Sequence, residues 1–93
     1  NLVAIEELPQ MQYGAATAIV LIVTEPGKEN HVIEKLRQIE EVTESLILFG
    51  EYDIFVKIQC PDFGLLSAIV VNVIRNIGGV ETTKTLTAAP LLD

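Results

Sequence analysis

A continuous apolar stretch, TAIVLIVT, covers residues 17–24. It is rich in β-branched residues and apolar at odd and even positions alike, which is typical of a central strand with both faces covered. The turn residues Glu25, Pro26 and Gly27 end this strand. The next segment, KENHVIEKLRQIE over residues 28–40, predicts an amphipathic helix with its charged side chains in water. The inner face of this helix carries Val32, Ile33, Leu36 and Ile39.

Residues 42–60 predict a β-hairpin. The strand-forming runs VTESLILF and YDIFVKIQC flank Gly50 and Glu51. Glycine at the first position of a two-residue loop suits a type II′ turn. This turn fixes the register of the two strands, so that Glu44 faces the oppositely charged Lys57, as cross-strand neighbours should be.

The register assigns each hairpin side chain to one of two faces. The face expected to meet the helices carries Ile47, Phe49, Tyr52, Ile54, Val56 and Ile58. The other face carries Val42, Glu44, Leu46, Leu48, Asp53, Phe55, Lys57 and Gln59. Because this second face is half apolar and half charged, we expect another subunit, rather than water alone, to cover it.

The last third of the chain predicts a second helix and a last strand. Asp62 is a suitable N-cap for a helix over residues 63–77, which ends at Gly78 and Gly79. The core face of this helix is expected to carry Leu66, Ile69, Val70, Val73 and Ile77. Val71 lies off that face, and its exposure favours a subunit contact. The run VETTKTLTA then predicts a strand with three threonines on one side, Thr83, Thr85 and Thr87.

The order strand, helix, strand, strand, helix, strand predicts a ferredoxin-like α+β sandwich, in which two helices cover one face of an antiparallel four-stranded sheet. The domain spans residues 17–93. Residues 1–16, which include Pro9 and Gly14, are expected to form an N-terminal extension with at most one short strand. A chain of 93 residues builds one core rather than two.

Composition narrows the functional classes. The net charge of −7, with only six scattered Lys and Arg residues, disfavours nucleic-acid binding. No apolar run approaches the ~20 residues of a membrane-spanning helix, and no targeting peptide is evident. The single cysteine cannot form an internal disulfide, which favours a reducing compartment. We therefore predict a cytoplasmic domain that binds neither membranes nor nucleic acid, and its 49% apolar residues favour a homo-oligomer.

Residues that carry catalytic or metal chemistry are sparse. With one histidine, one cysteine and no tryptophan, the chain offers no catalytic triad, metal-ligand set or phosphate-binding loop. His31 is expected to be a solvated helix residue and Cys60 a small buried hydrophobe. Glu40, Glu41 and Glu44 are interpreted as a solvated corner. We predict no enzymatic activity, no cofactor and no metal.

Asp53 is the polar residue that needs an explanation. In the predicted register it faces Leu48 and lies near Leu46 and Phe55, so its carboxylate would lose hydration once another subunit covered that face. It then needs a cation or several donors. The exposed turn backbone beside it could bind the α-amino and carboxylate groups of a small zwitterion. The alternative is that Asp53 stays in water at the end of the sheet, and the residues alone leave both interpretations open.

Three motifs together resemble a known family. They are Gly50-Glu51-Tyr52-Asp53 followed by IFVKI, EPGKE before the first helix, and IGGVETTKTLT at the last strand. In this order they resemble the effector domain of the Lrp/AsnC (feast/famine) transcription regulators, the RAM domain, over residues 17 to about 89. The resemblance implies a fold of the dimeric α+β barrel type, with dimers formed by sheets packed face to face. It also implies higher rings, commonly octamers, with amino-acid effectors at the contacts between dimers.

The resemblance assigns roles to six residues by position, Gly50, Glu51, Tyr52, Asp53, Thr85 and Thr87. The first two would offer turn backbone, the tyrosine would wall the pocket, and the aspartate would receive the ligand's ammonium group. The two threonines match last-strand positions near the family's pocket.

One departure from the family concerns the N-terminus. Typical members place a helix-turn-helix DNA-binding domain before this module, and residues 1–16 cannot form one. We therefore expect a stand-alone effector module or a fragment, and the acidic charge favours the stand-alone form. Such a copy could sense amino acids or join mixed rings with full-length Lrp/AsnC regulators.

Two other functions are considered. A purely structural assembly module would form the same oligomer without a ligand. An enzyme of the dimeric α+β barrel type is disfavoured, because the predicted core side of the hairpin is apolar where such an enzyme needs a polar cavity.

Overall fold

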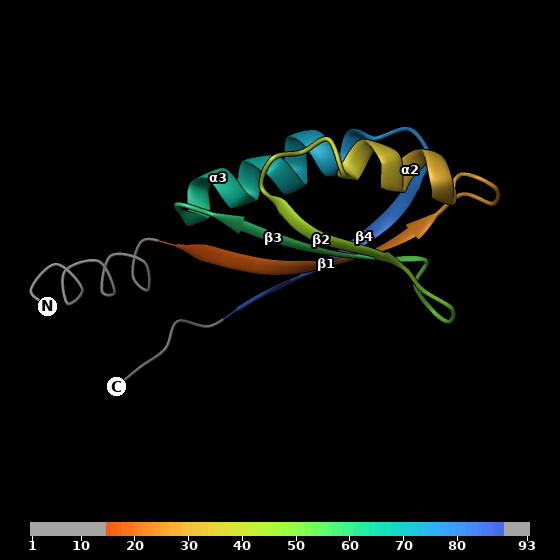
Figure 1. Ribbon diagram of the computed structural model, residues 1–93, viewed down its shortest axis with the longest axis horizontal. Coiled ribbons are helices and arrows are strands. Elements are labelled where there is room, and N and C mark those ends of the chain that lie inside the picture. Colours follow the sequence, from red (N-terminus) through yellow and green to blue (C-terminus); the bar gives the residue numbers. More distant parts are fainter. Residues whose placement is uncertain (1–14, 89–93) are drawn as a thin grey trace, which may run out of the picture.

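The computed structural model of the protein describes residues 15–88, which form an antiparallel four-stranded sheet with all helices on one of its faces (Figure 1). The elements are β1 (Ala16–Thr24), α2 (Glu29–Leu36), β2 (Val42–Ile47), β3 (Ile54–Cys60), α3 (Phe63–Ala68) and β4 (Val80–Thr87). The strand order is β2-β3-β1-β4. The predicted ferredoxin-like α+β sandwich is therefore confirmed. Of the predicted extension, residues 1–14 lie outside the described part of the chain.

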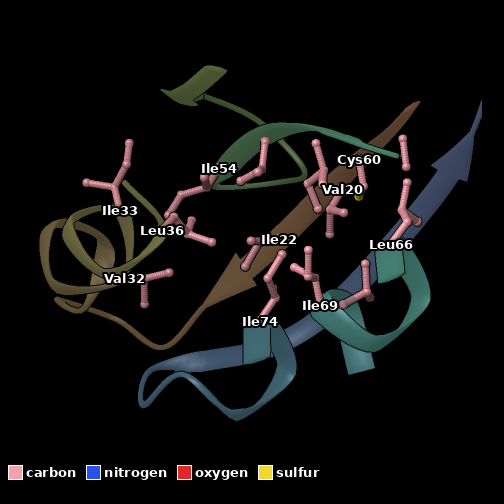
Figure 2. Packing of buried hydrophobic residues seen from close by; sticks show 14 residues of the cluster. Val20, Ile22, Val32, Ile33, Leu36, Ile54, Cys60, Leu66, Ile69 and Ile74 are labelled. Carbon is pink, nitrogen blue, oxygen red and sulfur yellow. The ribbon is translucent and has the colours of Figure 1, made fainter. Parts of the chain in front are cut away.

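The core lies between the sheet and the helices (Figure 2). β1 is the central strand, and its alternate residues Ala18, Val20 and Ile22 are fully buried beneath the helices. The opposite face of β1 is half-buried within a single chain, so the expectation of two covered faces is met on one side only. No helix within residues 15–88 is long and apolar enough to cross a membrane.

The first helix follows the predicted pattern. α2 buries Val32, Ile33 and Leu36 against the sheet, and Ile39 packs on the core from the turn that follows. His31 is exposed, as expected for a solvated helix position.

The predicted hairpin register is correct over most of its length. Glu44 pairs with Lys57, and the pairing continues to Ile47 opposite Ile54. A β-bulge between Val42 and Glu44 shifts the register there. Because an extra residue in a strand exchanges its two faces, Val42 packs on the core, and its assignment to the other face was wrong.

The predicted two-residue turn between β2 and β3 was wrong. β2 ends at Ile47 and β3 begins at Ile54, so residues 48–53 form a longer connection, which we call the hairpin loop. It projects from the end of the sheet, away from the helices (Figure 1). Ile47 is consequently 46% exposed and Phe49 fully exposed. The prediction that both side chains belong to the core was therefore wrong. Ile54, Val56 and Ile58, which lie beneath the helices, are fully buried as predicted.

The second helix is not uniform. Asp62 caps it as predicted, since its Oδ1 accepts a hydrogen bond of 2.8 Å from the Leu65 backbone N–H. α3 then continues as a π-helical stretch, η1 (Ile69–Val73), and a 3₁₀ turn, η2 (Ile74–Asn76). A π-turn contains one residue more than an α-turn, and this moves the inner face from Val73 to Ile74. Val73 is 42% exposed and Ile74 fully buried, so the predicted core position was one residue too early.

Candidate functional site

The base of the hairpin loop is held firmly to the sheet. The Leu48 N–H donates to the Asp53 carbonyl, and the Asp53 N–H donates to the Ile22 carbonyl of β1, each at 2.8 Å. Gly50 and Glu51 at the tip are exposed, and Gly50 has a φ of 139°, which favours glycine. The loop therefore combines a fixed base with an exposed tip.

The Asp53 carboxylate finds hydrogen-bond donors within its own chain. Its Oδ2 accepts from the Thr24 backbone N–H at 2.8 Å and from Thr24 Oγ1 at 3.3 Å. The N–H groups of alternate residues in a strand point to the same neighbour, so the Thr24 N–H points toward β3 as the Ile22 carbonyl does. Beyond Ile54 the backbone of β3 no longer offers a carbonyl to this N–H group, and the Asp53 carboxylate accepts the hydrogen bond instead. Asp53 is half-buried, and no hydrogen bond within residues 15–88 uses its Oδ1.

The sequence prediction missed Thr24 as the partner of Asp53. The sequence did contain an indication of this contact. Thr24 continues the alternation of the buried positions Ala18, Val20 and Ile22 of β1, and it is polar. It is only 5% exposed. A buried threonine that ends a strand needs hydrogen-bond partners, and an acidic residue at the end of the neighbouring strand supplies them.

The six predicted site residues fall into two groups within one chain. Gly50, Glu51, Tyr52 and Asp53 belong to the hairpin loop, and Tyr52 is half-buried. Thr85 and Thr87 lie on β4, on the far side of β1 from β3, opposite Val20 and Ala18. With ~3.3 Å per residue and ~4.8 Å between strands, Thr85 lies roughly 14 Å and Thr87 roughly 19 Å from Asp53. One small amino acid cannot contact both groups of the same chain.

The threonines of β4 lie along a groove instead. Their strand partners are the buried residues of β1, so Thr83, Thr85 and Thr87 share one side as predicted, and this side faces the helices. Between β4 and the second helical segment is a groove of about 590 Å³. We call this the α3–β4 groove. It is lined by Phe63, Leu66, Ser67, Val70, Val71, Arg75, Val80, Glu81, Thr82, Thr83, Thr85 and Thr87.

The groove has a mixed chemical character. Phe63 and Val71 are 59% and 47% exposed on its helical wall, and Arg75 adds a cation near the start of β4. The exposed position of Val71 agrees with the sequence prediction. The side-chain hydrogen bonds within residues 15–88 do not involve Arg75 or the β4 threonines. These polar groups are thus available to a ligand or a partner.

The face of the sheet opposite the helices carries both apolar and charged side chains. Its middle row consists of Leu46, Phe55, Leu21 and Lys84, one from each strand, and the next row of Glu44, Lys57, Ile19 and Leu86. Leu46 and Leu86 are 49% and 47% exposed. This open face carries the apolar and charged mixture that the sequence predicts for the outer side of the hairpin.

Other chemically active side chains do not form a centre. No group of three or more histidine, cysteine or acidic residues within residues 15–88 could hold a metal ion. Cys60 is 5% exposed, in agreement with its prediction as a buried hydrophobe. Burial raises the pKa of the Cys60 thiol, and the nearby Glu41 and Asp62 carboxylates raise it further.

Comparison with known proteins places this geometry in a family. A family model described as the Lrp/AsnC ligand-binding domain matches residues 17–89. The regulatory protein AsnC of Escherichia coli K12 is 30% identical over 77 residues, which are 83% of this chain and 51% of AsnC. The chain thus spans about half the length of the curated relatives it matches. AsnC is a regulatory protein.

Solved structures share the fold. FFRP-DM1 superimposes with a TM-score of 0.77 at 36% identity, over 80% of this chain and 99% of that one. The regulator NMB0573 of Neisseria meningitidis, solved as a complex with L-Met, has a TM-score of 0.74 at 16% identity, over 94% of this chain and 56% of that one. This second likeness concerns the fold alone. The match over residues 17–89 and the AsnC relationship show that the chain belongs to the Lrp/AsnC ligand-binding domain family.

Proposed function

We propose that this domain is an oligomeric amino-acid-binding effector module of Lrp/AsnC-type transcription regulation. The observation that carries the proposal is the hairpin loop, whose base is held by backbone hydrogen bonds of 2.8 Å while Gly50 and Glu51 are exposed. A fixed base suits recognition of a small zwitterion, because the binding groups are ordered before the ligand arrives. Family membership and the L-Met complex of a protein with the same fold support an amino acid as the ligand.

The proposed roles follow from the atoms that the fold leaves available. Asp53 receives the ligand's ammonium group through Oδ1, because Oδ2 already accepts from Thr24. The backbone of Gly50 and Glu51 binds the polar groups of the ligand, and the half-buried Tyr52 forms a wall. The threonines of β4 join this site from another copy of the chain.

The assembly is built on the open face of the sheet. Its rows of apolar side chains, flanked by charged ones, suit face-to-face packing of two copies into a dimer. Dimers then assemble into a higher ring, for which an octamer is the family's common form. A full-length Lrp/AsnC regulator is a further partner, since it would present the same kind of domain.

The experiment is isothermal titration calorimetry of the purified oligomer against the twenty amino acids singly. The decisive variant is Asp53→Asn, because the amide oxygen can still accept from the Thr24 N–H while the negative charge is lost. The matched control is Glu40→Gln, which removes one carboxylate from an exposed position outside the site. Binding of one or a few amino acids, abolished in Asp53→Asn and retained in the control, is the expected result.

A second candidate function is that of a purely structural assembly module. The hydrogen bond between the Thr24 N–H and the Asp53 carboxylate supports it. The bond from the Thr24 N–H gives Asp53 a role in the fold that needs no ligand. This candidate predicts no heat of binding from any amino acid, and an Asp53→Asn oligomer indistinguishable from the parent. Silence from all twenty amino acids in a folded oligomer would contradict the effector proposal for free amino acids.

A further inference from the structure

Thr24 ends the apolar row of β1 with a polar side chain. It follows Ala18, Val20 and Ile22 on the helix-covered side of the strand and is 5% exposed. Valine has nearly the same shape and would continue the row without a hydroxyl. Because a buried hydroxyl costs free energy unless it is hydrogen-bonded, the value of a threonine here depends on the group that it bonds. That group is the Asp53 carboxylate.

Thr24 fully occupies one of the two carboxylate oxygens of Asp53. Oδ2 accepts from the Thr24 N–H at 2.8 Å and from the Thr24 hydroxyl at 3.3 Å. A carboxylate oxygen has about two lone-pair sites, so these two donors fill Oδ2. Both donors are fixed, the N–H by the strand and the hydroxyl by the restricted χ1 of a β-branched residue. Within residues 15–88, Oδ1 is thus the oxygen that is left for a further donor.

The backbone of Asp53 is fixed as well. Its N–H donates to the Ile22 carbonyl and its carbonyl accepts from the Leu48 N–H, each at 2.8 Å. The side chain therefore starts from an ordered backbone and is held again at Oδ2. The position of Oδ1 is consequently set before a ligand arrives. Such preorganisation improves affinity, because the side chain need not be ordered at the moment of binding.

A carboxylate with one free oxygen discriminates between cations. A primary ammonium group is a compact charge that a single oxygen can accept, whereas a guanidinium group binds a carboxylate best through two parallel N–H groups, one to each oxygen. Oδ2 of Asp53 cannot accept the second of these N–H groups while both donors of Thr24 are in place. The free oxygen therefore favours an ammonium group, and the Thr24 hydroxyl maintains this preference.

We propose that Thr24 is a positioning residue of the effector site, which holds Asp53 as a one-oxygen acceptor and so makes the site select a primary ammonium group over a guanidinium group. The inference rests on the proposed function, in which Asp53 receives the ammonium group of an amino acid. It adds a residue that acts through Asp53 without touching the ligand, and a chemical rule for the cation that the site accepts. The contact between Thr24 and Asp53 lies within one chain, so it does not depend on a second copy.

The test compares Thr24→Val with Thr24→Ser by isothermal titration calorimetry of the purified oligomer. Thr24→Val removes the hydroxyl and keeps the backbone N–H, whereas Thr24→Ser keeps both donors. The probes are the twenty amino acids singly and, for each one that binds, the same molecule with its α-ammonium group replaced by a guanidinium group. Thr43→Val is the matched control, because the Thr43 hydroxyl makes an exposed hydrogen bond of 3.4 Å to the Lys57 carbonyl, outside the site.

Two changes are expected in Thr24→Val. The Kd for the amino acid should rise about 2- to 10-fold, which is the cost of ordering one side chain on binding. The preference, defined as the Kd of the guanidinium probe divided by that of the amino acid, should be at least ~10 in the parent and fall at least ~3-fold in Thr24→Val, because Oδ2 can then accept a second N–H. Thr24→Ser and Thr43→Val should keep both quantities within ~2-fold of the parent.

A purely structural role of Thr24 predicts a different result. Loss of the hydroxyl would then change the urea midpoint, measured by circular dichroism on the same samples, and leave the preference as it is in the parent. An unchanged preference in Thr24→Val, an equal fall in Thr24→Ser, or equal binding of both probes by the parent would overturn this inference and leave the proposed function standing. Silence from all twenty amino acids with the folded parent would overturn the proposed function and this inference with it.

Discussion

Gly79 is the position where a single added methyl group should be most damaging. It follows the second helical segment with a φ of 101°, a conformation that side chains rarely adopt. A Cβ at this position would lie 2.8 Å from Lys28 Cβ and 3.1 Å from Val32 Cγ2. The Lys28 Cβ is attached to the backbone, so it cannot move aside as the end of a side chain would. The Gly79 carbonyl also accepts from the Glu25 N–H at 2.8 Å, which ties the two turns together.

The expected cost of Gly79→Ala combines three effects. A non-glycine residue in such a conformation costs ~1–3 kcal/mol, and forcing extra atoms into a packed site costs ~1–3 kcal/mol. The lower entropy of the unfolded alanine chain offsets about 0.4–1 kcal/mol of this. We expect a net loss of roughly 1–5 kcal/mol in the free energy of unfolding. For a domain of this size, each kcal/mol corresponds to a fall of ~4–8 °C in Tm.

The neighbouring glycine provides a matched control. A Cβ at Gly78 would meet no atom within 4 Å, and its φ lies outside the range that excludes side chains. Gly78→Ala should therefore be neutral or stabilising by up to ~1 kcal/mol. The assay is urea unfolding followed by circular dichroism at one chain concentration, since oligomers depend on it. Equal effects of the two variants, or a loss below ~0.5 kcal/mol for Gly79→Ala, would refute the reasoning.

Three further predictions concern the core and the helix start. Asp62→Ala should cost ~1 kcal/mol, because the Leu65 N–H loses its cap, and Asp62→Asn should restore most of it in the same urea assay. Ile74→Ala should cost ~2–5 kcal/mol and the exposed Val73→Ala clearly less, whereas the reverse order would contradict the π-helical shift. Because burial and nearby carboxylates raise the pKa of Cys60, its thiol should stay protonated at neutral pH. Alkylation of Cys60 by iodoacetamide should be slow in the native protein. Its rate should increase only at a pH higher than the pH at which a free thiol begins to react, and it should become fast in urea.

Local patterns were sufficient to predict the architecture. The β-branched run of β1, the spacing of Val32, Ile33 and Leu36, and the cap at Asp62 each report a local preference that the fold retains. The Glu44 and Lys57 pairing fixed most of the hairpin register correctly. These signals agree with one another, and such agreement is what allows a sequence to specify one fold.

Two core residues were predicted wrongly because one extra residue in a strand or a helix changes which side chains face the core. The bulge before Glu44 turned Val42 toward the core, and the π-helical stretch exchanged Val73 for Ile74. Neither the bulge nor the π-helical stretch contains a glycine or proline, so the sequence does not indicate where the extra residue lies. Phe49 was assigned to the core by alternation, although alternation says nothing about how far the helices extend over the sheet.

The sequence anticipated one local property of the candidate site, the need of Asp53 for a hydrogen-bond partner. The sequence picked out Asp53 as needing a partner, and the structure supplies one in Thr24, a contact between strands far apart in the chain. The distance between the hairpin loop and Thr85 could not be foreseen, because it follows from the strand order. The roles of both groups in ligand binding stay predictions, which the calorimetry described above tests.

The strand order also constrains how the chain can fold. β1 bonds to β3 on one edge and to β4 on the other, and its residue Ala18 pairs with Thr87. Within residues 15–88, the strand made earliest, β1, therefore waits for the strand made latest, β4, before its ladder is complete. Contacts between such distant residues slow folding, because a long loop must close before any bond forms. We expect the sheet of residues 15–88 to be completed only after β4 has been made, and the apolar stretch 17–24 to have only β3 and the helices for cover until then.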